Sequence, residues 1–191
     1  MKEDRIRSQL LEVAARRFTD YGYGKTTVAE IAKDCGMSSG NVYRYYDSKE
    51  AIAIAGVEEK IEEKLATCEA ATDLSAPAIR QLRQYLLTRL RFTHAFNRGG
   101  AHLHELVQLI TDRHHDIIDK YDKRVIAWLA QIIGRGIERG EFRPQDAEQA
   151  AASILVATVM FSYPNFMQEP LDSMELKLSG LLELLHEALK A

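Results

Sequence analysis

Residues 36–52 read "GMSSGNVYRYYDSKEAI", and this stretch decides how the N-terminal part of the chain is interpreted. Small polar residues precede three tyrosines and an arginine, which is a poor composition for a helix in a hydrophobic core. Ser38 and Ser39 are both good N-caps, so we expect a short helix to begin there. A short helix with a polar surface suits contact with a charged partner.

A second short helix is expected immediately before this one. Thr27 and Glu30 have the spacing of a capping box, so a helix should begin at about Val28, and Gly36 should end it. Two short helices joined by a glycine-containing turn are typical of a helix-turn-helix, whose second helix enters the DNA major groove. The alternative is a generic three-helix bundle with solvated tyrosines.

The side chains around the second short helix have the chemistry of a DNA contact. Its first residues are small and polar and would let the helix approach bases and phosphates closely: Ser38, Ser39, Gly40 and Asn41. Asn41 can pair with a base edge, and Arg44 can reach guanine or a phosphate. Tyr43 and Tyr45 offer hydroxyl donors to phosphate oxygens. Lys49 lies in the first turn of the next helix, where a cation is unfavourable, so a phosphate partner would explain it.

Helical periodicity runs through the whole chain, and no stretch alternates convincingly like a strand. Before the two short helices we expect a helix over 4–21, ended by Gly22 and Gly24. The longer helices that follow are expected over 49–70, from Ser75 to about Phe96, over 101–111 and 115–139, from Asp146 to about Ser162, and over 172–189. The chain is therefore predicted to be all-α, with about nine helices and a loop at 97–100.

Composition excludes few classes of function. The chain has 191 residues, 46% apolar and 28% charged, as in an ordinary globular protein, and its net charge of −3 requires any anion-binding surface to be local. It has only two cysteines, no apolar run long enough to cross a bilayer and no secretory leader pattern. We expect a soluble cytoplasmic protein without a membrane partner.

Residues 10–52, "LLEVAARRFTDYGYGKTTVAEIAKDCGMSSGNVYRYYDSKEAI", resemble the DNA-binding domain of the TetR family of bacterial transcriptional regulators. The ordered matches include the helix around Ala14–Phe18, Thr26-Thr27, Val42-Tyr43 and Lys49-Glu50. Tyr46 stands where phenylalanine is commoner, and Cys35 where alanine is usual. The resemblance implies a phosphate contact by Thr27, a recognition surface that includes Ser38, Ser39, Asn41, Arg44 and Tyr45, and a grip on the DNA backbone by Tyr43 and Lys49.

The resemblance also implies two domains with different roles. Residues 1–50 would form the helix-turn-helix domain and residues 51–191 a helical domain that binds a small-molecule effector and dimerises. The protein would then repress transcription from a palindromic operator and release the operator when the effector binds. Candidate residues lining the effector site are Leu86, Leu90, Phe92, Phe96, Leu106, Ile110, Tyr121 and Trp128, although ordinary core packing is the alternative for each.

The last two helices are the expected dimer surface. The last carries Leu176 and Leu184 beyond its main apolar stripe, and a helix in a monomeric core needs only one such stripe; the helix before it carries a face of small residues that a partner can approach closely. Their candidate interface residues are Ala151, Ile154, Thr158, Phe161, Leu178, Leu181, Leu182 and Leu185. Two helices from each subunit would form a four-helix bundle, as the family resemblance implies. The alternative is that both faces pack within one chain.

Five of the six histidines lie between residues 94 and 115: His94, His102, His104, His114 and His115. His102 and His104 diverge on a helix and no His-Glu-x-x-His spacing occurs, so we predict no metal site. The sequence also lacks a phosphate-binding glycine loop and a nucleophile elbow, so we predict neither an enzyme nor a cofactor. A scaffolding protein and a metal-dependent enzyme built on these histidines are the rival interpretations.

Overall fold

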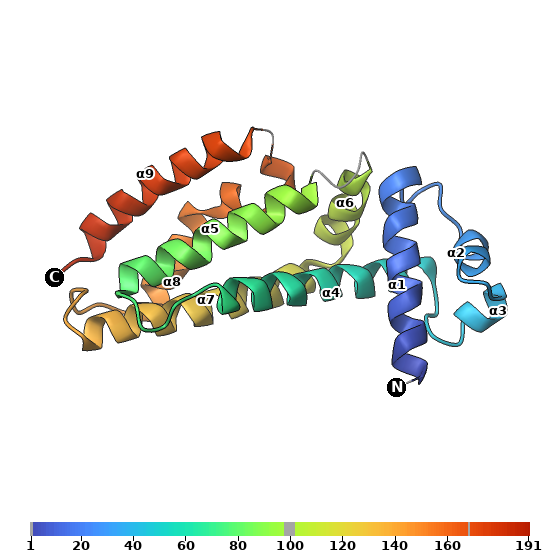
Figure 1. Cartoon of the computed structure of the whole chain (residues 1–191), viewed down its shortest axis with the longest axis horizontal. Helices are drawn as coiled ribbons and strands as arrows, with labels where there is room; N and C mark the ends of the chain where they lie inside the picture. The colour runs from blue at the N-terminus through green and yellow to red at the C-terminus, as the bar shows by residue number, and fades with distance from the viewer. Residues whose placement is uncertain (1, 98–101, 168) are drawn as a thin grey trace. The chain divides into compact units, whose positions relative to one another are not determined.

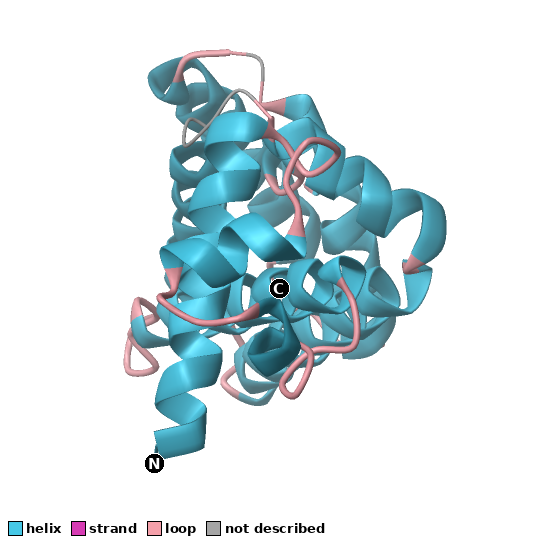
Figure 2. Ribbon diagram, turned by 90° about the vertical axis from the view of Figure 1, so that its right-hand side faces the viewer, coloured by secondary structure: helices cyan, strands magenta, loops and turns pink. Residues whose placement is uncertain are grey.

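The computed structural model describes residues 2–97, 102–167 and 169–191, and it is helical from end to end within these ranges (Figure 1). Its α-helices are α1 (Lys2–Tyr21), α2 (Val28–Asp34), α3 (Ser39–Val42), α4 (Lys49–Ala70), α5 (Ala78–Asn97), α6 (Leu103–Arg113), α7 (His115–Glu138), α8 (Ala147–Ala157) and α9 (Leu171–Leu189). Two 3₁₀ helices, η1 (Val159–Phe161) and η2 (Pro164–Phe166), lie between α8 and α9. Helices and loops account for all the described residues in Figure 2, apart from an isolated bridge between Phe142 and Lys190. The all-α prediction is confirmed.

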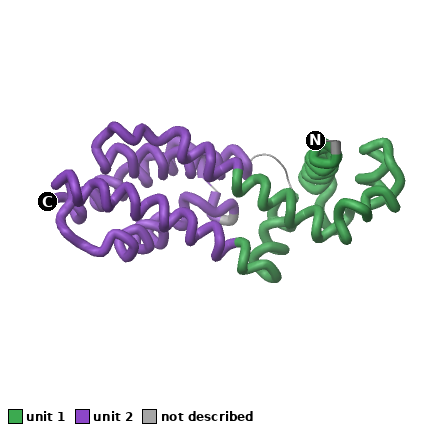
Figure 3. Tube along the Cα trace, turned by 90° about the horizontal axis from the view of Figure 1, so that it is seen from below, with its two compact units in different colours: residues 1–62, 98–117 green, residues 63–97, 118–191 purple. Residues whose placement is uncertain are grey.

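The chain forms two compact units (Figure 3). Unit 1 comprises residues 1–62 and 98–117, and unit 2 comprises residues 63–97 and 118–191. This differs from the predicted division at residue 50, because α6 joins the N-terminal helices. Within unit 1 the backbone N–H of Gly24 donates to Glu105 Oε2 at 2.7 Å. Sequence periodicity does not reveal such long-range contacts.

The core of unit 1 is built on the apolar face of α1. Leu10, Val13, Ala14 and Phe18 recur at helical spacing and are buried, as their periodicity predicts. Helix α1 packs against α2, and α2 packs against α3. Gly22 has a φ of 93° and ends α1, because a residue with a side chain is strained in that conformation.

In unit 2, α5 and α9 lie side by side (Figure 1). Their exposed edges are joined by ion pairs, one between Arg83 and Glu183 and one between Arg91 and Glu175. The core contains many of the apolar positions of the long helices: Leu82, Leu86, Leu90, Val125, Leu129, Ile132, Ile133, Met174, Leu178 and Leu182. None of the described helices is both long and apolar enough to span a membrane.

The predicted helix from Asp146 to about Ser162 is too long. Asp146 does cap α8, because its side chain accepts the backbone N–H groups of Glu148 and Gln149. However, α8 ends at Ala157, and Thr158 donates its hydroxyl to the carbonyl of Ile154. The backbone of Thr158 has a φ of −104° and a ψ of 9°, which leaves the α-helical conformation, and the chain continues in the tighter η1. Of the predicted loop at 97–100, residues 98–100 lie outside the described ranges, as does residue 101, the predicted start of the next helix.

Gly136 allows α7 to approach its neighbours closely. A Cβ at this position would lie 2.5 Å from a ring carbon of Phe142 and 2.8 Å from the Cβ of Ala78. Gly134, one half-turn earlier in the same helix, has no such neighbour within 4 Å. Gly134 is therefore a matched control for the effect of a substitution at Gly136.

We expect Gly136→Ala to lower the free energy of unfolding by about 1–3 kcal/mol, because Phe142 must move out of a well-packed position. Gly134→Ala should instead raise it by about 0.5–1 kcal/mol through helix propensity alone. Urea unfolding followed by circular dichroism measures both. Equal effects of the two substitutions would contradict the close approach.

Candidate nucleic-acid interface

Helix α2 is fixed by the capping box that its sequence predicts. Thr27 Oγ1 accepts the backbone N–H of Glu30 at 3.3 Å, and the Glu30 carboxylate accepts the backbone N–H of Thr27 at 2.8 Å. The Thr27 hydroxyl also donates to that carboxylate at 2.8 Å. These hydrogen bonds lower the pKa of Glu30 below its ordinary value. Thr27 is exposed at the N-terminus of α2, where its predicted phosphate contact stays a prediction.

The turn between α2 and α3 has a glycine in the conformation that the turn needs. Gly36 has a φ of 68°, and the backbone N–H of Met37 donates to the carbonyl of Ala32 at 2.9 Å. Ser38 then caps α3, since its Oγ accepts the backbone N–H of Asn41 at 3.2 Å. Val42 is fully buried and fixes which face of α3 points inward. The helix-turn-helix geometry follows from these local features.

The face of α3 and the following turn carries the predicted contact residues together. Ser38, Gly40, Tyr43 and Arg44 are exposed, and the side chain of Arg44 has no partner among the described residues. Three others are half-exposed: Ser39, Asn41 and Tyr45. An unpartnered guanidinium next to exposed hydroxyls can donate to phosphates and base edges.

The two tyrosines that follow Arg44 pack against α1. Arg7 Nη1 donates to the backbone carbonyl of Tyr45 at 3.1 Å. Its guanidinium carbon lies 5.8 Å from the Tyr45 ring centroid and 5.4 Å from that of Tyr46. Burial raises the pKa of Tyr46, which packs in place of the phenylalanine that the family resemblance leads one to expect.

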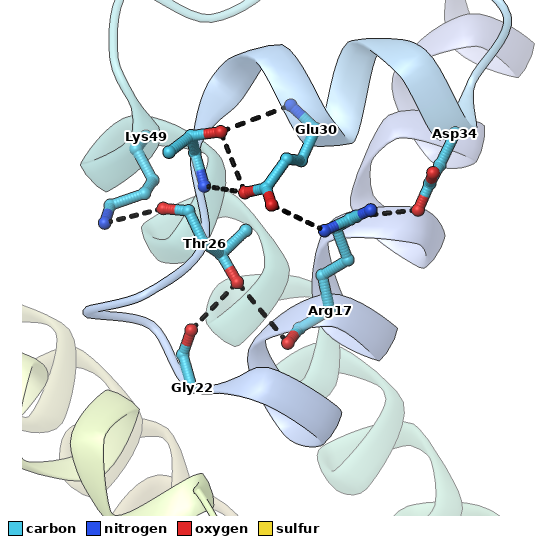
Figure 4. A network of polar contacts seen from close by, with 7 residues as sticks. Arg17, Gly22, Thr26, Glu30, Asp34 and Lys49 are labelled. Atoms are coloured by element: carbon cyan, nitrogen blue, oxygen red, sulfur yellow. Dashed lines mark hydrogen bonds and ion pairs between the residues drawn. The ribbon is translucent and has the colours of Figure 1, made fainter.

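Lys49 has partners that the sequence did not indicate. Its Nζ donates to the backbone carbonyls of Tyr23 at 2.7 Å and Thr26 at 2.9 Å, and lies 4.3 Å from the Tyr23 ring centroid (Figure 4 shows the contact with Thr26). These carbonyls explain a cation in the first turn of α4, which the sequence analysis explained by a phosphate. A lysine has three N–H donors, so one is left for DNA. The phosphate contact stays a prediction.

Arg17 connects α1 to α2 and was not singled out by the sequence. Its Nε donates to Asp34 Oδ2 at 2.6 Å, and its Nη1 lies 3.5 Å from Glu30 Oε1 (Figure 4). The hydrogen bond from Arg17 lowers the pKa of Asp34. The Thr26 hydroxyl donates to the carbonyl of Gly22 at 2.8 Å in the same network. Together these contacts fix the orientation of α2 on α1.

The predicted effector-lining residues are not all in one unit. Leu106 and Ile110 belong to unit 1, and the other six belong to unit 2. Within unit 2, Leu86, Leu90 and Tyr121 are buried, whereas Phe92, Phe96 and Trp128 are half-exposed. Their role in effector binding stays a prediction.

Two buried cations in unit 2 were missed by the sequence analysis. Arg89 is 1% exposed and Lys64 is 8% exposed, and both lie beside Tyr121. A signal was present for Arg89, because it falls in phase with the buried positions Leu82, Leu86 and Thr93 of α5. A charged residue on an apolar stripe indicates a buried polar site.

Most of the predicted dimer-interface residues are buried in the single chain. Six of the eight are buried within the chain: Ala151, Ile154, Thr158, Phe161, Leu178 and Leu182. These six side chains face the core of unit 2, and their assignment to a dimer interface stays a prediction. Leu181 and Leu185 are partly exposed. Leu176 and Leu184 of α9 are 75% and 70% exposed and are the large apolar residues of that helix that are fully exposed.

Three of the five clustered histidines have polar partners within their own units. His94 in unit 2 contacts the carbonyl of Glu169, and His102 in unit 1 contacts Glu105 Oε1, both at 3.1 Å. His114 Nε2 lies 2.8 Å from Glu50 Oε1. No group of three potential metal ligands occurs in the ranges that the structure describes.

Two family models match the chain. Residues 10–55 match the model described as bacterial regulatory proteins of the tetR family, and residues 78–175 match the tetracyclin repressor-like C-terminal domain. The chain is 25% identical to the uncharacterized HTH-type transcriptional regulator YhgD of Bacillus subtilis, over 92% of this chain and 91% of that protein. It is 26% identical to the HTH-type transcriptional repressor KstR2 of Mycobacterium tuberculosis, over 72% of this chain and 70% of that protein.

A solved transcriptional regulator from Cytophaga hutchinsonii has the same fold. It superposes with a TM-score of 0.74 at 19% identity, over 95% of this chain and 97% of that one.

We expect Lys49→Ala to lower the free energy of unfolding of unit 1 by about 1–3 kcal/mol, because two backbone carbonyls lose a charged donor. Lys25→Ala is the matched control, since Lys25 is exposed in the same loop and no contact of its side chain is seen among the described residues. Hydrogen exchange of the amides in residues 22–28 measures the local effect. Equal protection in the two variants would show that Lys49 does not stabilise this loop.

Proposed function

The chain belongs to the TetR family and is a DNA-binding transcriptional regulator, and we propose that it is a homodimeric repressor that a small-molecule effector releases from a palindromic operator. The observation that carries the DNA contact is the exposed face of α3 with the unpartnered guanidinium of Arg44. Repression is proposed because KstR2, to which 72% of the chain aligns, is a transcriptional repressor.

A single helix-turn-helix reads too few base pairs to define a site in a genome. Two-fold dimers solve this by placing two copies on half-sites about 34 Å apart or multiples of that distance. The operator of such a dimer is a palindrome, because the symmetry of the DNA follows that of the protein. No metal ion or cofactor is needed for this activity.

The exposed face of α9 supports the homodimer. Leu176, Gly180 and Leu184 follow one another at four-residue steps, and such a row forms a ridge on a helix surface. Gly180 is exposed and has no neighbour within 4 Å of a Cβ position, so a second helix can approach its backbone. Exposed Val156 on α8 adds to the apolar area of the unit. A second copy of the same face is the simplest partner for this surface.

Selection of DNA sites from a random library tests the function directly. We expect an enriched palindrome, whose half-site spacing gives the separation of the two α3 helices in the dimer. Failure to enrich any sequence with folded, dimeric protein would count against the proposed repressor in its effector-free form.

We expect Arg44→Ala to weaken binding to the selected site by about 1–3 kcal/mol, through loss of a guanine or phosphate contact. The fold should be unchanged, because the side chain is exposed and unpartnered among the described residues. Arg143→Ala removes an equivalent exposed charge from unit 2 and serves as the control. Fluorescence anisotropy over a series of salt concentrations measures both, and equal affinities of the two variants would rule out the assigned contact.

We expect the double substitution of Leu176→Glu and Leu184→Glu to produce monomers, because carboxylates at the centre of an apolar interface remain unpaired. Leu74→Glu is the control, since Leu74 is also exposed in unit 2 and lies on a loop. Analytical ultracentrifugation measures the molecular mass. A dimer that survives the double substitution would place the interface elsewhere.

A further inference from the structure

Unit 2 contains a cluster of buried hydrogen-bond donors that lacks acceptors. Arg89 Nε donates to the Tyr121 hydroxyl at 2.8 Å, but Nη1 and Nη2 of Arg89 are buried and have no partner among the described residues. The hydroxyl of Tyr85, one turn earlier on α5, and Nε1 of Trp128 are likewise buried and unpartnered there. The Tyr85 and Trp128 rings stack with centroids 6.5 Å apart.

Lys64 brings a second positive charge to the same place. Its Nζ lies 5.1 Å from the Tyr121 ring centroid, and the guanidinium carbon of Arg89 lies 5.4 Å from that centroid. Lys64 donates to the backbone carbonyl of Ser162 at 2.9 Å. No carboxylate forms an ion pair with Lys64 or Arg89 in the described part of the chain. Asp122, the acidic residue next to Tyr121, accepts instead from the Tyr163 hydroxyl at 2.6 Å.

The pKa values of Lys64 and Tyr121 are both shifted in this cluster. Burial lowers the pKa of Lys64 and so disfavours its charged form, an effect that a bound anion would oppose. Burial alone would raise the pKa of the Tyr121 hydroxyl, yet Arg89 and Lys64 outweigh it and hold that pKa below its ordinary value. A buried cation without a counter-ion is unfavourable by several kcal/mol, so buried charges are normally paired. Two buried cations that have no counter-ion in the described part of the chain are explained if their counter-ion is a bound ligand.

We propose that Lys64 and Arg89 form a buried anion site, and that the effector of this regulator carries a carboxylate that accepts the unpartnered N–H groups of Arg89. The planar fork of a guanidinium matches the two oxygens of a carboxylate. Because the site is buried, a singly charged carboxylate is favoured over a phosphate, whose double charge is harder to desolvate. Apolar Leu86 and Leu90 on the same helix suit an apolar body for the effector.

The identification of the bound anion as the effector rests on the proposed function. The anion site itself is tested without DNA. The probes are acetate and acetamide, which have the same shape and differ in charge, with inorganic phosphate as the other anion. Each is added to the full chain at matched ionic strength and pH, and thermal unfolding is recorded. The variants are Arg89→Met and Lys64→Met, with Arg83→Met as the control for a surface arginine on the same helix.

For the wild type and the Arg83→Met control we expect acetate to raise Tm by about 3–6 °C when it is tenfold above its Kd, whereas acetamide leaves Tm unchanged. Arg89→Met should abolish the rise, and Lys64→Met should reduce it. Equal shifts with acetate and acetamide, an equal shift in Arg89→Met, or no shift with acetate would overturn the site. A shift with phosphate alone would overturn the assignment to a carboxylate.

A ligand-free measurement separates an anion site from a structural role of Arg89. Replacement of an unpaired buried cation by methionine should leave Tm equal or higher, because apolar replacements of buried charges are often neutral or stabilising. A fall in Tm in Arg89→Met would mean that Arg89 stabilises the core and would overturn the proposal.

DNA binding is then compared in the same variants. Arg89→Met should bind the selected operator as the wild type does in the absence of acetate. Its complex should resist release by any carboxylate that releases the wild type. Wild-type protein that selects no operator would contradict the proposed function, and the acetate result would still decide the anion site.

Discussion

The two short helices α2 and α3 depend on α1 for their stability, and the arrangement of the helix-turn-helix follows from that constraint. Helix α2 has seven residues and α3 has four, and helices this short are not stable alone in water. They are held by the buried face of α1 around Phe18 and by the pairing of Arg17 with Asp34. Because Val42 must point inward, the opposite face of α3 with Arg44 must point to solvent. The proposed DNA-contacting surface is therefore a consequence of packing as well as of its own sequence.

Local chemistry explains which parts of the fold the sequence could predict. The capping box at Thr27, the left-handed turn at Gly36 and the cap at Ser38 each depend on neighbours within a few residues, so their pattern is visible in one sequence. The starts of most helices were predicted for the same reason. The partners of Lys49 lie more than twenty residues away, and no local pattern encodes them. The early end of α8 also went unpredicted, because the apolar pattern continues past Thr158, where the backbone leaves the α-helical conformation.

Periodicity shows that a face is buried and does not show what buries it. Leu178 and Leu182 lie on a clear apolar stripe, and the structure places them in the core of their own chain. Leu176 and Leu184 lie out of phase with that stripe, as the sequence indicates, and the structure places them on the exposed face of α9. The same argument applies to Arg89. Its position on an apolar stripe of α5 is visible in the sequence, but its contacts depend on the fold. Residues that break a helical pattern are thus more informative about function than residues that complete it.

Binding of an anion at the proposed site would release a free energy of the right size to drive a switch between two states. A ligand moves an equilibrium between two states from 1:99 to 99:1 only if it binds one state about 5.5 kcal/mol more tightly. Breaking one partner of a buried ion pair destabilises a protein by about 3–5 kcal/mol, so an anion paired with Arg89 and Lys64, as proposed, would supply most of that difference. An effector bound only by apolar contacts would gain similar energy in both states, since apolar contacts adapt to small shifts of helices. A charge pair requires fixed geometry, and it therefore distinguishes the state in which α4, α5 and α7 hold Lys64, Arg89 and Tyr121 together from any state in which they do not.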